Sequence, residues 1–161
     1  MPGPNSRTLT RVSEMPSPDD TSFSETTTRP PDAPVVIVGD SEELLRLFEN
    51  LIENALKYGA SGGKVAVSLT SAMSGEGVPE VRVTVRDFGP GIAPEHLPRL
   101  TERFYRVDVG DSRAQGGTGL GLSLVKHIVN RHRGRLLIES VPKKGAAFTA
   151  CFPQVKNPAD A

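Results

Sequence analysis

The sequence predicts an α+β fold, a two-layer α/β sandwich in which helices cover one face of a mixed sheet. One stretch repeats apolar residues at helical spacing, and several shorter runs alternate apolar with polar residues as half-buried strands do. The predicted elements follow the order strand, helix, hairpin, loop, helix and hairpin. In such an order the helices gather on one side of the sheet.

Three parts of the chain differ in composition. Residues 1–33 hold six prolines and eleven serines or threonines, with few large apolar side chains, so we expect a disordered tail there. The rest of the 161 residues predicts one domain at 34–154 and a frayed C-terminus at 155–161. The formal net charge is zero, which argues against binding to nucleic acid through a broad basic face.

Composition also restricts the cellular setting. No apolar run approaches the roughly 20 residues of a membrane helix, and the first residues lack the apolar core of a signal peptide. The single cysteine, Cys151, cannot form an internal disulfide, which fits a reducing compartment. We therefore expect a cytoplasmic chain that makes no membrane contact of its own.

The predicted strands and helices can be placed by residue number. Residues 35–38 are a β-branched run that predicts a first strand, and 41–58 predict a long amphipathic helix. Asp40 and Glu43 are spaced as in a capping box at the start of that helix. The remaining elements are strands at 64–70 and 81–86, helices at 95–100 and 120–132, and strands at 135–140 and 147–152.

Two asparagines lie one turn apart at the border of the long helix's apolar face. Asn50, Asn54 and Lys57 fall together along this border. Asparagine is a poor helix former because its amide competes with the backbone, so two of them at this spacing indicate a function. An amide oxygen can ligate Mg²⁺, which usually keeps several waters and shares substrate phosphates. The alternative is a pair of structural amides at a helix edge.

Glycine-containing segments follow the strand at 81–86 and precede the helix at 120–132. The strand ends at Asp87, which can accept a hydrogen bond from a ligand amino group, and Gly89 and Gly91 let a flat ligand approach. The later glycine cluster, at 116–121, opens a helix whose free N–H groups can bind phosphate. Polar residues 107–118 predict a mobile lid, or otherwise an ordinary surface loop. Together these features predict a nucleotide site.

Four motifs resemble, in order and at normal spacing, those of the catalytic ATP-binding domain of bacterial sensor histidine kinases. That family shares the Bergerat fold with gyrase, Hsp90 and MutL, and the resemblance covers about residues 35–153. The fine detail of 101–109 is also similar to phosphate-regulon sensor kinases. The motifs are an N box at 50–58, a first glycine box at 87–92, an F box at 102–108 and a second glycine box at 117–122.

The resemblance implies a role for each matching residue. At the base, Asp87 would bind the adenine amino group, Gly89 and Gly91 would let the base approach, and Ile92 and Tyr58 would line its pocket. At the phosphates, Asn54 would ligate Mg²⁺, Asn50 would order that site, and Lys57 and Arg106 would contact phosphate. Phe104 would anchor the lid. The second glycine box would bend around the phosphates through Gly117, Thr118, Gly119, Leu120, Gly121 and Leu122.

The implied chemistry is phosphoryl transfer from ATP, with Mg²⁺ as cofactor and Asn50, Lys57 and Arg106 as the catalytic residues. Asn50 is a neutral amide where the gyrase-type ATPases carry a catalytic glutamate. This difference favours transfer to a protein side chain over activation of water.

The resemblance implies partners that the sequence does not contain. Sensor kinases carry a dimerisation domain with a phosphoacceptor histidine and pass the phosphoryl group to a response regulator; the full-length kinase would be membrane-anchored. Nothing here matches the acceptor motif, and we expect His96, His127 and His132 to be surface or packing residues. Without dimerising helices, we expect a monomer. A late glycine motif, at 145–148, also lacks its usual threonine.

Three functions remain open at this point. The favoured one is the catalytic domain of a histidine kinase, acting on an acceptor outside this chain. The alternatives are a free-standing anti-sigma-type serine kinase and a non-catalytic interaction module of the same fold. The F box at 102–108 argues against the serine kinase.

Overall fold

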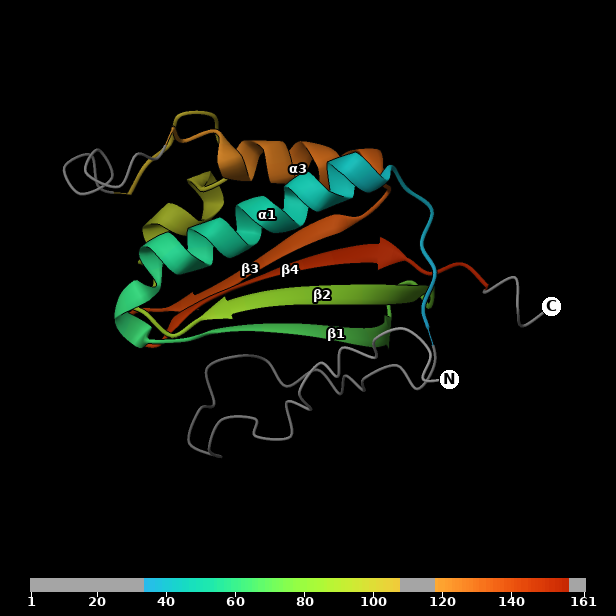
Figure 1. The fold of residues 1–161 in the computed structure, drawn as a ribbon, viewed down its shortest axis with the longest axis horizontal. Helices are drawn as coiled ribbons and strands as arrows, with labels where there is room; N and C mark the ends of the chain where they lie inside the picture. Colours follow the sequence, from blue (N-terminus) through green and yellow to red (C-terminus); the bar gives the residue numbers. More distant parts are fainter. Residues whose placement is uncertain (1–33, 108–117, 157–161) are drawn as a thin grey trace, which may run out of the picture.

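The described residues of the computed structural model, 34–107 and 118–156, form two layers (Figure 1). One layer is a four-stranded sheet. Helices α1 (Ser41–Tyr58) and α3 (Gly121–Arg131) lie side by side on one face of it. The α+β class predicted from the sequence is therefore confirmed, whereas the predicted tail at 1–33 lies outside the described residues.

All strands of the sheet pair antiparallel. They are β1 (Val65–Met73), β2 (Pro79–Asp87), β3 (Arg135–Val141) and β4 (Gly145–Pro153), in the spatial order β1-β2-β4-β3. Short turns join each hairpin, which makes both hairpins antiparallel, and β4 also runs antiparallel to β2. The described strands thus form an antiparallel sheet where the sequence analysis expects a mixed one.

Residues 35–38 do not form the predicted strand. Val36 makes one isolated antiparallel bridge with Val155, and the Val155 N–H donates to the Val36 carbonyl at 2.9 Å. Val38 is 76% exposed, because the backbone already turns toward α1 at Gly39. The bridge also gives Val155 a backbone partner, although the sequence predicts fraying from that residue. Residues 157–161 lie outside the described part.

The start of α1 is held by residues from the end of α3. Asp40 Oδ1 accepts hydrogen bonds from the N–H groups of Glu42 and Glu43 at 2.9 and 3.0 Å, which is the predicted N-cap. The second bond of a capping box, from the Asp40 N–H to the Glu43 carboxylate, is replaced by other contacts. The Asp40 N–H donates to His132 Nε2 at 2.9 Å, while Glu43 pairs with Arg131. His132 is therefore the packing residue that the sequence analysis expects.

The hydrophobic core lies between the helices and the sheet face that they cover. Leu47 and Leu51 of α1 and Val125 and Val129 of α3 are fully buried there. On β4, Ala146, Phe148, Ala150 and Phe152 alternate onto the same side and belong to the same core cluster. Burying one such large side chain contributes roughly 1.5–3 kcal/mol, so this face fixes how the two layers stack.

Two short 3₁₀ helices connect these elements. One, η1 (Ala60–Gly62), follows α1, and the other, η2 (Pro94–Arg99), takes the place of the helix predicted at 95–100. Leu100 is buried directly after η2 and ties this connection to the core. Among the helices of the described residues, none has the length and apolarity needed to cross a membrane.

Candidate nucleotide-binding site

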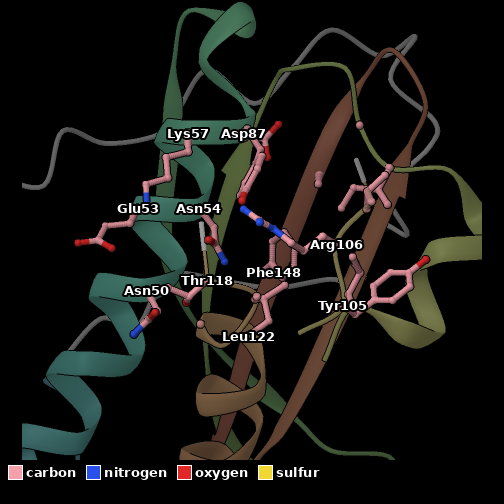
Figure 2. Close-up of a pocket in the computed structure, with 18 of the residues that line it drawn as sticks. Asn50, Glu53, Asn54, Lys57, Asp87, Tyr105, Arg106, Thr118, Leu122 and Phe148 are labelled. Atoms are coloured by element: carbon pink, nitrogen blue, oxygen red, sulfur yellow. The ribbon is translucent and has the colours of Figure 1, made fainter. Parts of the chain in front are cut away.

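A cavity of about 500 Å³ opens between α1, the start of α3 and the adjoining ends of β2 and β4. Figure 2 shows Asn54 and Lys57 on the α1 wall, with Arg106 reaching into the cavity from the opposite side. Twelve of the sequence-predicted site residues line it: Asn50, Asn54, Lys57, Tyr58, Asp87, Gly91, Ile92, Arg106, Thr118, Gly119, Gly121 and Leu122.

Asp87 is the last residue of β2 and the buried acid of the cavity. Its exposed fraction is 6%, and its Oδ1 accepts a hydrogen bond from the Gly89 N–H at 3.0 Å. This bond closes the turn that leaves the strand and fixes the carboxylate orientation. A carboxylate accepts up to about four hydrogen bonds, so one bond to Gly89 leaves capacity for a ligand donor.

Glycines pack against the side chain and the backbone of Asp87, where larger residues would not fit. A Cβ at Gly59 would lie 2.2 Å from the Asp87 Cβ, and one at Gly145 would lie 2.1 Å from its carbonyl oxygen. Gly145 also has a φ of +95°, which favours glycine. Neither glycine is among the predicted site residues, although Gly145 opens the late glycine motif at 145–148. Their packing against Asp87 depends on tertiary contacts that local spacing does not reveal.

The two glycines predicted beside Asp87 have different positions. Gly91 lines the cavity with a φ of +71°, and a Cβ there would lie 2.3 Å from the Val141 carbonyl oxygen. Gly89 does not line the cavity. A Cβ on Gly89 would lie 2.7 Å from the Gly59 Cα, so this glycine lets the turn pack against the end of α1.

The two asparagines of α1 lie differently in the cavity wall. Asn50 Nδ2 donates to the Arg46 carbonyl at 2.7 Å, and its Oδ1 lies 2.8 Å from where a Cβ of Gly121 would be. The Asn50 amide is thus fixed against its own helix and the start of α3. Among the described residues, the Asn54 side chain makes no hydrogen bond, and it faces the cavity (Figure 2).

The F box contributes backbone and side-chain contacts of different kinds. Tyr105 and Arg106 line the cavity, but the Phe104 ring is 70% exposed and does not. The Phe104 N–H donates to the Gly119 carbonyl at 2.9 Å, and Phe104 has a φ of +62°. The backbone of Phe104, rather than its ring, therefore joins the two sides of residues 108–117. Those residues, most of the predicted lid, lie outside the described part.

The start of α3 presents backbone N–H groups to the cavity. Thr118, Gly119, Gly121 and Leu122 line this end, and no side chain caps the helix N-terminus among the described residues. Uncapped N–H groups and the helix dipole favour an anion there. Leu120 lies instead beside a second hollow, and the predicted Gly117 is outside the described residues.

Several cavity residues are absent from the sequence prediction. One of them is Glu53 of α1, which lies at the edge of the cavity (Figure 2). The others are mostly apolar, and the sequence assigns none of them a role in binding. They are Pro90, Leu100, Tyr105, Val107, Ala146 and Phe148. The alternation at 147–152 marks Phe148 as one side of a strand, but that pattern does not distinguish core from cavity floor.

The described residues contain no group of three or more His, Cys, Asp or Glu side chains that could hold a metal by themselves. A Mg²⁺ ion bound with a nucleotide needs less protein, because waters and phosphates complete its shell. The Asn54 amide, one turn from Lys57 and opposite the glycines of α3, fits that partial role.

Comparisons with known proteins place these residues in a family. Residues 39–156 match the family described as "Histidine kinase-, DNA gyrase B-, and HSP90-like ATPase". The phosphate regulon sensor protein PhoR of Pseudomonas aeruginosa is 47% identical over 121 residues, which are 74% of this chain and 26% of PhoR. The chain spans about a quarter of the length of the curated relatives it matches.

Solved structures agree with this assignment. The mycobacterial sensor histidine kinase MprB has a TM-score of 0.63 and 31% identity, over 77% of this chain and 78% of that chain. Full-length ShkA, solved in complex with AMPPNP, has a TM-score of 0.60 and 28% identity over 77% of this chain and 24% of ShkA. The resemblance in the four motifs is confirmed: the chain belongs to the family of histidine kinase-, DNA gyrase B- and HSP90-like ATPases.

Proposed function

We propose that this chain binds Mg·ATP in the cavity and transfers the γ-phosphoryl group to a histidine on a dimerisation domain outside residues 34–156. One observation carries the proposal. A single cavity has a buried carboxylate, Asp87, at one end and the uncapped start of α3 at the other, with Asn54 and Lys57 between them. This arrangement matches the polarity of a nucleotide, which has a donor-bearing base at one end and anionic phosphates at the other.

The base would lie at the Asp87 end of the cavity. The exocyclic amino group of adenine is a donor, and the free acceptor capacity of the Asp87 carboxylate complements it. Gly91 lacks a side chain, and Ile92 and Phe148 offer apolar surface against a flat ring. Guanine presents a carbonyl oxygen at the corresponding position, so this end favours adenine.

The phosphates would lie between α1 and the start of α3. Lys57 is exposed at the cavity rim, and its ammonium makes no hydrogen bond among the described residues. The N–H groups of Gly121 and Leu122 lie at the positive end of the α3 dipole. Bound Mg²⁺ would neutralise phosphate charge beside Asn54. Arg106 points into the same space and would contact the γ-phosphate.

The reaction needs little covalent chemistry from these residues. A ring nitrogen of the acceptor histidine attacks the γ-phosphorus with its lone pair, the new P–N bond forms, and the bond to the β–γ bridging oxygen breaks. ADP leaves with that oxygen. Positioning and charge stabilisation by Lys57, Arg106 and the α3 N–H groups then supply most of the catalysis.

The acceptor domain must reach the mouth of the cavity. Exposed apolar side chains lie near it: Leu120 and Leu124 line the second hollow, and the exposed Phe104 is joined through its backbone to Gly119 of the cavity wall. A histidine-bearing helical domain with apolar side chains would cover this surface when it delivers its imidazole. The phosphoryl group would pass onward to a response regulator, and the use of ATP implies that the domain acts in the cytoplasm.

A phosphorylation assay tests the proposal. The chain is incubated with γ-labelled Mg·ATP and an isolated histidine-bearing dimerisation domain of a sensor kinase. We expect label on that domain that is lost in acid and kept in base, as for a phosphoramidate. Acid-stable label on a serine would support the anti-sigma-type kinase. Binding of the acceptor domain without ATP and without transfer would support a non-catalytic module.

A further inference from the structure

The cavity wall contains a side-chain pair to which the four motifs assign no role. Tyr105 lines the cavity with its ring, and its hydroxyl is 2.5 Å from Nδ1 of His96 in η2. Figure 2 shows the Tyr105 hydroxyl turned away from the cavity, while the next residue, Arg106, points into it. Which of the two atoms donates depends on the imidazole tautomer.

The Tyr105 ring is held on a second side by Arg99. The Arg99 guanidinium carbon lies 4.4 Å from the centre of the ring, and Arg99 also pairs with Glu102 at 3.3 Å. These two contacts are mostly exposed, and exposed pairs contribute little. The partly buried bond to His96 is therefore the stronger restraint on the hydroxyl end of Tyr105.

The backbone directly before Tyr105 is restrained as well. Phe104 has a positive φ, which is uncommon for a residue with a side chain, and its N–H is bound to Gly119. A Cβ at Gly119 would lie 2.8 Å from the Phe104 Cα, so the backbone segments that contain Phe104 and Gly119 are in close contact. With the backbone fixed at 104 and the ring fixed by His96, the direction of the Arg106 side chain has little freedom.

We propose that His96 and Tyr105 are positioning residues that aim Arg106 at the γ-phosphate. The inference rests on the proposed function. Neither side chain touches the transferred group: Tyr105 acts by fixing the segment that carries Arg106, and His96 acts by fixing Tyr105. Because only ATP carries a γ-phosphate, the pair affects binding of ATP more than binding of ADP.

The test measures the affinities of the whole chain for Mg·ATP and Mg·ADP by calorimetry. Tyr105→Phe keeps the ring, the cavity wall and the Arg99 contact, and it removes only the hydroxyl. His96→Ala removes the other partner. We expect each variant to lower the ratio of ATP affinity to ADP affinity by about fivefold, the effect of one hydrogen bond, with ADP affinity changed less than about twofold. Arg106→Gln should lower the ratio at least as much.

Three further variants separate positioning from a general structural effect. The double variant should lose no more than the larger single variant, because both substitutions break the same bond. His96→Asn keeps an acceptor near the Nδ1 position and should restore most of the ratio. Glu95→Gln, at the exposed neighbouring position of η2, should leave it unchanged.

The outcomes distinguish this inference from the proposed function. If the wild-type chain binds neither nucleotide, both fail. If it binds ATP and Arg106→Gln lowers the ratio while Tyr105→Phe and His96→Ala do not, only the positioning role is overturned. Equal loss of ATP and ADP affinity in the two variants would also overturn it, since that result indicates a structural role.

Discussion

Polar side chains gather in two regions of the molecule, and they behave differently in each. On the sheet face away from the helices, Glu80 is 3% exposed and accepts two hydrogen bonds from Arg135, at 2.6 and 2.8 Å. Arg82 Nε donates to the same carboxylate at 2.7 Å. Burial raises the pKa of Glu80, but the hydrogen bonds from Arg135 and Arg82 outweigh it, so the pKa lies below its ordinary value.

In the cavity, by contrast, polar groups face a shared space instead of one another. The side chains of Asn54 and Lys57 make no hydrogen bond among the described residues, and one oxygen of Asp87 is bonded only to Gly89. Charges that pair with each other stabilise the fold. Charges that converge on a cavity cost stability and are retained for a ligand. The comparison thus separates a structural network from a binding site.

The largest effect on folding is expected when the network of Glu80, Arg135 and Arg82 is broken. Glu80→Gln removes the charge and leaves Arg135 and Arg82 without their shared carboxylate. We expect the free energy of unfolding to fall by about 2–3 kcal/mol, toward the low end for broken buried pairs because Arg135 is partly exposed. Urea denaturation measures this loss. Glu49→Gln, exposed on α1, serves as the control, and an unchanged ATP affinity is expected in both.

The opposite pattern is expected for Lys57→Gln. Its ammonium has no partner within the described residues, so stability should change by less than about 0.5 kcal/mol. Affinity for Mg·ATP should fall about tenfold, as expected for loss of one charged contact to phosphate. Lys126→Gln, an exposed position on α3, should change neither quantity. Loss of stability with unchanged affinity would place Lys57 in a structural network instead.

Asn54→Ala tests whether a cavity side chain that is unpaired among the described residues acts through a bound metal ion. If the Asn54 amide contacts Mg²⁺, affinity for ATP should fall about fivefold in the presence of Mg²⁺ and stay unchanged in a chelator. Titrating both conditions by calorimetry separates the metal effect from the nucleotide effect. An equal loss with and without Mg²⁺ would argue that Asn54 contacts the nucleotide directly.

The smallest effect is a change with pH in the stability that the Glu80 network contributes. Because the pKa of Glu80 is lowered on folding, its stabilisation is complete above the unfolded pKa and is lost as the pH falls through the folded pKa. The stability difference between wild type and Glu80→Gln should therefore be constant at neutral pH. It should shrink as the pH falls below about 4.3, the unfolded value for glutamate. Urea midpoints at several pH values measure it, and a difference that persists unchanged at pH 2 would contradict the account.

Local signals in the sequence predict some elements closely. The long helix was predicted at 41–58, and α1 has the same bounds, because Asp40 caps its start and Gly59 follows its end. The four strands of the sheet were placed within a few residues, since their alternation reports directly which side is buried. The candidate site was also largely predicted, because its residues are concentrated in motifs whose spacing is visible along the chain.

The features that the sequence did not predict depend on contacts between distant segments. The single bridge at Val36 replaced a predicted strand because the chain turns early to bring Asp40 against His132. The crowding of Gly59 and Gly145 around Asp87 joins residues that no local pattern relates. The backbone bond from the Phe104 N–H to the Gly119 carbonyl also joins two motifs that lie apart in the sequence, whereas the predicted role of Phe104 as lid anchor stays a prediction because residues 108–117 lie outside the described part.

The central claim is that the cavity binds adenine nucleotide through Asp87, and calorimetric titration with Mg·ATP tests it most directly. Asp87→Asn keeps the shape of the side chain and the oxygen that accepts the Gly89 N–H, but it removes the negative charge. We predict micromolar binding to the wild-type chain and at least tenfold weaker binding to the variant, about 1.4 kcal/mol, with no loss of thermal stability. Equal affinity in the two proteins, or no binding to the wild-type chain, would contradict the account.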